Sequence, residues 1–125
     1  MYTPKHFKAS ELVPRGYERY WLTLMDERIL RTLDAIREHY NRPVLVNHAG
    51  MQNRGWRPPD SKVGAKLSQH KFGRAADLTV SGIPAEQVRN DIRSGLFPLI
   101  TAIEAGVSWV HIDVRNVERL MEFEA

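Results

Sequence analysis

The sequence contains no cysteine, and this absence excludes several classes of protein. A disulfide scaffold, a cysteine zinc finger, an iron–sulfur cluster and a cysteine nucleophile all require a thiol. Long hydrophobic runs are missing as well, because no apolar stretch approaches the roughly 20 residues that span a bilayer. Residues 1–8 lack the apolar segment of a secretory signal. We therefore expect neither a signal peptide nor insertion into a membrane.

A large excess of charge of one sign is also absent. Lys and Arg number 18 and Asp and Glu number 15, so the formal net charge is only +3, and the basic residues are interspersed with acids. A nucleic-acid-binding domain is disfavoured, since there is no basic helix and no aromatic sheet motif. The small positive balance suits an anionic partner. With 42% hydrophobic residues, the chain is expected to form one domain over residues 1–125, and a monomer is favoured.

The pattern of apolar residues predicts an α+β fold. Apolar residues repeat at helical spacing between residues 26 and 40, and Pro84 is placed to start a second helix that ends near residue 94. Short apolar and β-branched runs predict strands at residues 43–46, 75–80, 101–104, 109–115 and 120–123. Because helices and strands fall in separate blocks, we expect a small antiparallel sheet with helices packed on one face.

His70 and Asp77 flank a tight turn and are candidate metal ligands. Gly73 marks the turn, and residues 75–80 then form a strand in which side chains alternate between two faces. The apolar members of this strand belong to the core. Asp77 therefore lies on the opposite face, where the turn can bring His70 back toward it.

The alternation is clearer in the strand predicted at residues 109–115. Its three β-branched residues point to the core, and the opposite face carries Trp109, His111, Asp113 and Arg115. Two histidines and one aspartate on one sheet face match a catalytic zinc site, which has three protein ligands and an open position for water. The alternative is a hydrogen-bonded cluster of His and Asp at the surface, and spacing alone leaves both open.

Two motifs resemble the signature of a known family. The first is Ser68-x-His70-x-x-Gly73-x-Ala75-x-Asp77, and the second, further along the chain, is Trp109-Val-His111. In this order they resemble the zinc D-Ala-D-Ala carboxypeptidases and peptidoglycan endopeptidases of the peptidase M15 type, which have the hedgehog signalling domain as a more distant relative. The resemblance implies that His70, Asp77 and His111 bind Zn²⁺ on the face of the sheet opposite the helices.

The resemblance also implies a general base near the third ligand. Many members place a Glu three residues before that histidine, where this chain has Ser108. Glu104 matches a second arrangement, in which the base lies on a neighbouring strand, and alternation allows it to face the site. Asp113 is the rival catalytic candidate because it shares a face with His111. The alternative role for Asp113 is to support the ligand His111 by hydrogen bonding.

Four further residues are candidates for substrate binding. Relatives often carry a Ser-Gly-Tyr-Arg-like stretch, whereas this chain has a polar loop over residues 47–69, in which Arg54 and Arg57 are expected to be exposed. Either arginine could pair with a substrate carboxylate, and the alternative is a solvated loop arginine. Ser68 is expected to orient the turn or the ligand histidine by hydrogen bonding, and Trp109 to form a wall of the pocket.

The resemblance implies a zinc-dependent peptidase that hydrolyses amide bonds in peptidoglycan stem peptides or crosslinks, as a D,D-carboxypeptidase or an endopeptidase. The small size and the segment from Arg54 to Pro59 resemble phage and prophage members. This implies an endolysin made in the bacterial cytoplasm, which acts on the cell wall after release or as part of a phage particle. The alternative is a non-catalytic, zinc-containing module that binds the cell wall or has a structural role in a phage.

Overall fold

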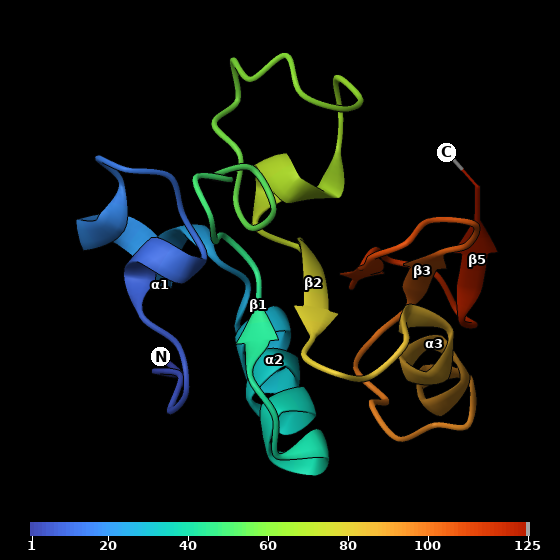
Figure 1. The fold of residues 1–125 in the computed structure, drawn as a ribbon. Helices are drawn as coiled ribbons and strands as arrows, with labels where there is room; N and C mark the ends of the chain where they lie inside the picture. The colour runs from blue at the N-terminus through green and yellow to red at the C-terminus, as the bar shows by residue number, and fades with distance from the viewer. Residues whose placement is uncertain (125) are drawn as a thin grey trace.

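The computed structural model describes residues 1–124, which form an α+β fold on one five-stranded sheet (Figure 1). The strands are β1 Val44–Leu45, β2 Ala75–Val80, β3 Ala102–Glu104, β4 Val110–Asp113 and β5 Met121–Phe123. They lie side by side in the order β1-β2-β4-β3-β5. The strands occur where the sequence predicts them, although all except β2 are shorter than predicted.

One strand pair departs from the expected antiparallel sheet. The pairs β1–β2, β2–β4 and β4–β3 are antiparallel, but β5 runs parallel to β3. The chain leaves β4 at Asp113, whose partner on β3 is Ala102, and β5 begins at Met121, which also pairs with Ala102. Since β5 starts beside the end at which β3 starts, it runs in the same direction. The sheet is therefore mixed, and the prediction of an antiparallel sheet is wrong at this edge.

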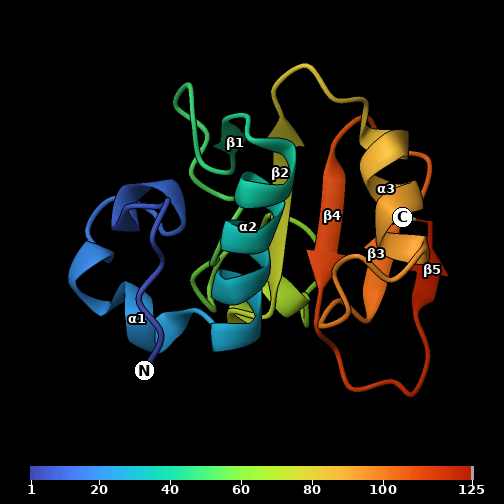
Figure 2. The same cartoon turned by 90° about the horizontal axis from the view of Figure 1, so that it is seen from below.

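The longest helix, α2 Glu27–Tyr40, follows the apolar periodicity of its sequence. Asp26 caps its N-terminus by accepting a hydrogen bond from the Arg28 amide, and Asn41 ends it in the left-handed conformation. A second helix, α3 Ala85–Arg93, packs against β4 (Figure 2). The two helices share one hydrophobic cluster with the sheet, which includes Ile29, Leu33, Leu78, Val88, Ile92, Val110 and Ile112.

Short helical turns precede α2. They are η1 Ala9–Glu11, η2 Glu18–Tyr20 and α1 Trp21–Leu24. The buried carboxylate of Asp34 on α2 fastens the N-terminal arm, since it accepts hydrogen bonds from the Tyr2 hydroxyl, from the Lys5 amide at 2.8 Å and from the His6 amide at 3.1 Å. No helix within residues 1–124 is long and apolar enough to cross a membrane.

The loop between β1 and β2 is partly buried. Trp56 is 5% exposed and packs on Tyr17, with 4.9 Å between ring centroids. The Trp56 amide donates a hydrogen bond to the Leu12 carbonyl at 2.8 Å. At Gly55, a Cβ atom would lie 2.1 Å from the Leu12 carbonyl oxygen, so only glycine permits this approach. The first half of the loop is therefore anchored to the N-terminal segment, and its second half leads through the short helix η3 Gln69–Phe72 into β2.

Gly73 makes the turn from η3 into β2. Its φ of 69° lies in the left-handed region, and a Cβ atom would lie 1.8 Å from the Leu24 carbonyl oxygen. The Gly73 carbonyl accepts a hydrogen bond from the Asp26 amide at 2.9 Å. The turn is thus docked against the connection between α1 and α2, which fixes where β2 begins.

We expect Gly73→Ala to lower the free energy of unfolding by more than about 3 kcal/mol, because the added Cβ both strains φ and displaces backbone atoms. Gly95→Ala is the matched control. Its φ is 93°, but nothing lies within 4 Å of the added Cβ, so only the conformational strain applies. Urea unfolding of both variants measures the difference. Equal losses of stability would show that the close approach to Leu24 is not required.

Candidate metal centre

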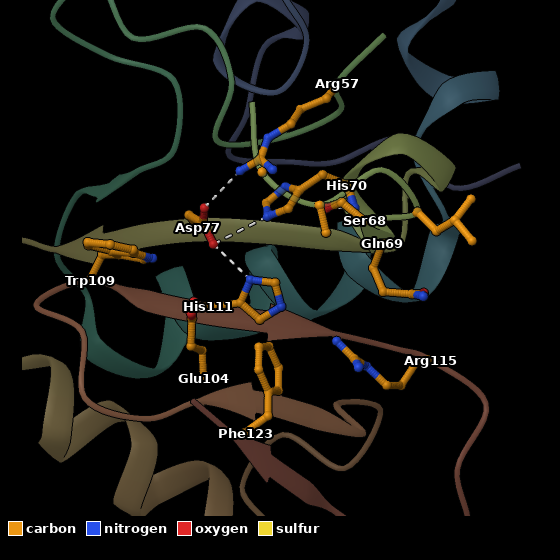
Figure 3. A pocket seen from close by; sticks show the side chains of 13 residues that line it. Arg57, Ser68, Gln69, His70, Asp77, Glu104, Trp109, His111, Arg115 and Phe123 are labelled. Carbon is orange, nitrogen blue, oxygen red and sulfur yellow. Dashed lines mark hydrogen bonds and ion pairs between the residues drawn. The ribbon is translucent and has the colours of Figure 1, made fainter. Parts of the chain in front are cut away.

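A row of polar and aromatic side chains crosses the sheet on the face opposite the hydrophobic cluster. Asp77 on β2 and His111 on β4 are direct register partners. The pairing of β4 with β3 continues the row to Glu104, with which Phe123 on β5 pairs. Since side chains at paired positions share a face of the sheet, these residues surround one space (Figure 3). Ile103 is buried in the core while Glu104 faces this space, as the alternation predicts.

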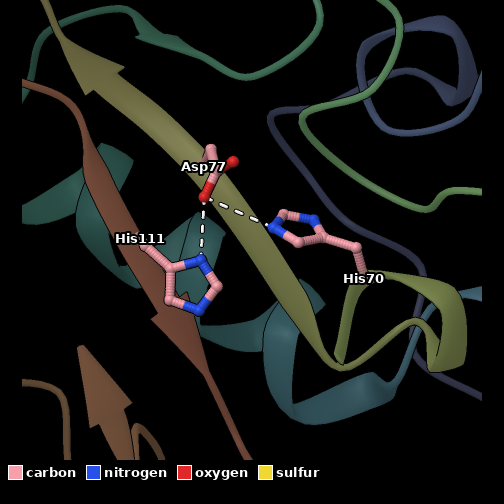
Figure 4. Close-up of side chains that lie close together, drawn as sticks. All are labelled: His70, Asp77 and His111. Atoms are coloured by element: carbon pink, nitrogen blue, oxygen red, sulfur yellow. Dashed lines mark hydrogen bonds and ion pairs between the residues drawn. The ribbon is translucent and has the colours of Figure 1, made fainter. Parts of the chain in front are cut away.

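The short helix η3 adds His70 to this row. The Ser68 hydroxyl accepts a hydrogen bond from the His70 amide at 3.2 Å, which caps the helix and orients the turn. The imidazoles of His70 and His111 both point at Asp77 (Figure 4). His70 Nε2 lies 3.4 Å and His111 Nδ1 lies 2.9 Å from the same oxygen, Asp77 Oδ1. One donor atom from each of the three residues lies within 4.8 Å of the others.

The second nitrogen of each imidazole faces a hydrogen-bond acceptor. His70 Nδ1 lies 2.8 Å from the Gly55 carbonyl oxygen, and His111 Nε2 lies 2.8 Å from Asp113 Oδ2. A carbonyl or an ionised carboxylate only accepts, so these nitrogens carry protons. The nitrogens that face Asp77 donate to it when they are protonated, and in the neutral imidazoles they offer lone pairs to a metal ion that takes the place of those protons. In a tetrahedral site with ligands about 2.0–2.1 Å from zinc, the ligand atoms lie roughly 3.3 Å apart. The two distances to Asp77 Oδ1, 3.4 and 2.9 Å, lie near this value, so the three residues could hold such a metal ion.

Charge is compensated within this group by hydrogen bonds. Burial disfavours the charged form of His111, but hydrogen bonds to Asp113 and Asp77 outweigh it and raise the pKa of His111 to about 9. Burial likewise opposes ionisation of Asp77, yet hydrogen bonds from His111 and His70 hold the pKa of Asp77 well below its usual range. The space between these side chains therefore favours a positive charge, either a proton on His111 or a bound cation.

Asp113 lies behind His111 and does not line the cavity in front of it. It is fully buried, and its register partners are Ala75 and Ala102, whose small side chains leave room for it. Arg115 holds the carboxylate with two hydrogen bonds, 2.8 Å from Nε to Oδ1 and 2.6 Å from Nη2 to Oδ2. Burial opposes ionisation, but these bonds and the one from His111 lower the pKa of Asp113. From this position the carboxylate can orient His111.

A cavity of about 450 Å³ opens in front of the three candidate ligands. Besides these ligands, its walls include Arg57, Ser68, Gln69, Glu104, Trp109, Arg115 and Phe123 (Figure 3). Glu104 is 8% exposed, and within residues 1–124 its carboxylate forms no hydrogen bond or ion pair. The ring of Phe123 packs edge-on against His111, with 5.4 Å between centroids. A carboxylate without a protein partner in such a cavity is available to exchange a proton with a bound water.

The two loop arginines have different surroundings, and the expectation that both are exposed is wrong. Arg57 is only 8% exposed, because its Nε donates to the Asn53 carbonyl at 2.7 Å and its Nη2 lies 3.4 Å from Asp77 Oδ2. The loop folds back toward η3, where the Arg57 amide bonds the His70 carbonyl at 3.2 Å. Arg54 is half-buried and lines neighbouring cavities beyond Asp77.

Asn47 is a site-forming residue that sequence reasoning missed. Its Oδ1 accepts hydrogen bonds from the amides of Arg54 at 3.0 Å and Gly55 at 3.3 Å. The Gly55 carbonyl in turn holds His70, and the Arg54 carbonyl accepts the Asp77 amide at 2.7 Å. Two candidate ligands are thus positioned by a dipeptide that Asn47 clamps. An asparagine after a strand carries no signal of this role, because folding alone brings the dipeptide to it.

We expect Asn47→Ala to weaken both the fold and the metal centre. The variant leaves two amides without their acceptor, which costs about 1–3 kcal/mol of unfolding free energy. Loosening the residues that support metal ligands should lower metal affinity about 10- to 100-fold. Gln52→Ala in the same loop is the control, since its Oε1 accepts only the exposed Arg15 amide, at 2.7 Å. Urea unfolding and metal titration measure the two effects, and unchanged metal affinity in Asn47→Ala would contradict the positioning role.

Comparison with known proteins identifies the family. A model of the peptidase M15 family matches residues 5–113, which include the three candidate ligands and Glu104. The curated proteins and the solved structures returned no match. Peptidases of the M15 family are metal-dependent, in keeping with the group formed by His70, Asp77 and His111. Because the match covers most of the chain, this protein belongs to the peptidase M15 family.

Proposed function

We propose that the chain is a zinc-dependent peptidase that hydrolyses amide bonds in peptidoglycan stem peptides or crosslinks. One observation carries the proposal: two imidazoles and a carboxylate converge beside an open cavity, into which a further carboxylate, that of Glu104, faces without a partner among the described residues. Three protein ligands beside an open position are typical of catalytic zinc, whereas structural zinc sites have four. The additional carboxylate favours hydrolysis over a purely binding role.

The donor set is compatible with zinc, the metal that the resemblance to the zinc peptidases implies. Imidazole nitrogens suit zinc, and one carboxylate oxygen completes three of the four positions of a tetrahedron. When held by His70, Asp77 and His111, zinc supplies a Lewis acid and lowers the pKa of water to about 7. The Gly55 carbonyl and Asp113 keep the two imidazoles in the orientation that ligation needs.

Glu104 is the general base in this proposal. It faces the cavity beside His111, where its carboxylate accepts a proton from the attacking water and passes it to the leaving amine nitrogen. Asp113 supports His111 instead, because it is fully buried and does not line the cavity. Arg57 lies against Asp77 at the cavity wall, where its guanidinium stabilises negative charge that develops on the amide oxygen.

The charge of the site supports an anionic peptide as substrate. Arg57 and Arg115 line the cavity, and the whole chain carries a net charge of +3. Asp77 and Glu104 also line the cavity and balance these two arginines, so a bound Zn²⁺ would make it net positive. Peptidoglycan stem peptides are rich in carboxylates, which such a charge attracts. The proposal includes both D,D-carboxypeptidase and endopeptidase activity. A lysis role at the cell wall rests on the resemblance of the segment from Arg54 to Pro59 to phage and prophage members.

We expect one zinc ion per chain. Elemental analysis of protein purified without chelators should give near-stoichiometric zinc, and His111→Ala should lose most of it, because only two ligands remain. His48→Ala is the matched control, since its Nδ1 bonds the Val46 carbonyl at 3.0 Å and the residue lines a different cavity. Full zinc content in His111→Ala would refute the ligand assignment.

We expect Glu104→Gln to keep its fold and zinc but to hydrolyse purified muropeptides about 10²–10⁴-fold more slowly, the usual loss when a general acid–base group is removed. Asp113→Asn should lower the affinity for zinc about 10- to 100-fold, and its loss of turnover should follow from this weaker binding. Excess zinc should therefore restore turnover in Asp113→Asn but not in Glu104→Gln. Mass spectrometry of the muropeptides measures turnover.

Two outcomes would change this assignment. If Asp113→Asn loses turnover with zinc retained while Glu104→Gln stays active, the roles of the two carboxylates must be exchanged. If the zinc-loaded wild type cleaves no muropeptide but sediments with purified cell walls, the non-catalytic wall-binding alternative replaces the peptidase.

A further inference from the structure

Beyond the candidate ligands, two neighbouring cavities share lining residues with the main cavity, and the three together are called the groove. The second cavity, of about 320 Å³, shares Asp77 and Trp109 with the main cavity. The third cavity, of about 330 Å³, adjoins the second. Arg54 and Met51 line both of these neighbouring cavities. Glu104 lines the main cavity and not the other two. The groove therefore runs from Glu104, across Asp77, to Arg54.

The strand register sets the distance between this second part of the groove and the metal centre. Its lining includes Thr79, which follows Asp77 by two residues, and Trp109, which precedes His111 by two residues. At about 3.3 Å per residue, the displacement is roughly 7 Å. An extended peptide covers this length in about two residues. A substrate group bound there lies one or two residues from the scissile amide.

Arg54 places a cation in this second part without a partner from the described chain. Its guanidinium forms no hydrogen bond or ion pair with residues 1–124, whereas those of Arg57 and Arg115 are engaged by carboxylates. Burial lowers the pKa of Arg54, and the charge of Asp77 offsets this only in part. The main chain of Arg54 is held on both sides, at its amide by Asn47 and at its carbonyl by the Asp77 amide. Its side chain therefore extends from a fixed position.

Trp109 forms the wall between the two parts of the groove. Its side chain lies at one end of the main cavity (Figure 3) and is 37% exposed. The Trp109 carbonyl accepts a hydrogen bond from Nη1 of the buried Arg89 at 3.0 Å, which ties the start of β4 to α3. The wall is therefore anchored by the fold and does not depend on a bound substrate.

We infer that Arg54 forms a subsite for a free carboxylate of the peptide substrate, one or two residues from the scissile amide on the Trp109 side. The inference rests on the proposed peptidase function and specifies its substrate. A guanidinium pairs with a carboxylate through two parallel hydrogen bonds, which fixes both distance and orientation. Among the described residues that line this part, Asp77 is the only acid, and Arg57 and two histidines already compensate it.

The test uses pairs of synthetic stem peptides that are identical except for a free carboxylate or a carboxamide, at one or two residues from the cleaved amide. We would measure kcat/KM for zinc-loaded wild type, Arg54→Gln and the control Arg119→Gln, an exposed arginine away from the groove. We expect wild type and Arg119→Gln to prefer the free acid about 10- to 100-fold, mainly through KM. Arg54→Gln should reduce the preference to within about threefold, with zinc content unchanged.

Binding gives a second readout that does not need cleavage. Calorimetric titration of both peptides into zinc-loaded Glu104→Gln should show the same preference, and adding Arg54→Gln should remove it. A preference that persists without Arg54, or equal treatment of both peptides by wild type, overturns the inference and leaves the peptidase function intact. A binding preference without cleavage by wild type supports the subsite and refutes the peptidase function, whereas no binding of either peptide overturns both.

Discussion

The register between β2 and β4 is the constraint on which the candidate metal centre depends. In that register Asp77 is paired with His111 on one face of the sheet, while Leu78 and Ile112 enter the hydrophobic cluster on the other. Because side chains alternate with a period of two, a slip of one residue would turn a candidate ligand into the core and an apolar residue into the cavity. Burial of the core and assembly of the centre are therefore enforced by the same pairing. The position of Glu104 also depends on β4, since β3 pairs with that strand.

The centre gathers several ionisable groups in a buried region, and most of them compensate one another. Desolvation of an ionised group costs several kcal/mol unless opposite charges and hydrogen bonds offset it. Asp113 is offset by Arg115 and His111, and Asp77 by Arg57 and the two histidines. Such networks add little stability compared with apolar packing of similar volume, so their presence in a small domain points to function. A metal ion between the histidines and Asp77 would extend the same compensation.

Family membership and local geometry constrain different parts of the function. The match to the peptidase M15 family assigns the chain to metal-dependent peptidases, a statement about reaction class. A fold or family does not by itself identify a base or a substrate, because these depend on side chains in the site. The proposals for the base and the substrate therefore rest on the carboxylate of Glu104 and the guanidinium of Arg54, which have no side-chain partner within residues 1–124. Arg57 and Arg115, by contrast, are ion-paired with Asp77 and Asp113.

Local patterns in the sequence determine the parts of this protein that depend on neighbours along the chain. Periodicity predicts α2, alternation predicts β2 and the polar face of β4, and a short glycine turn predicts that His70 meets Asp77. Only the tertiary structure decides that β5 runs parallel to β3, that Arg57 is buried and that Asp113 lies behind its histidine. The orientation of His70 likewise depends on the carbonyl of Gly55, which is 15 residues away in the sequence. Periodicity and alternation describe one segment at a time, so they carry no information about contacts between segments that only folding brings together.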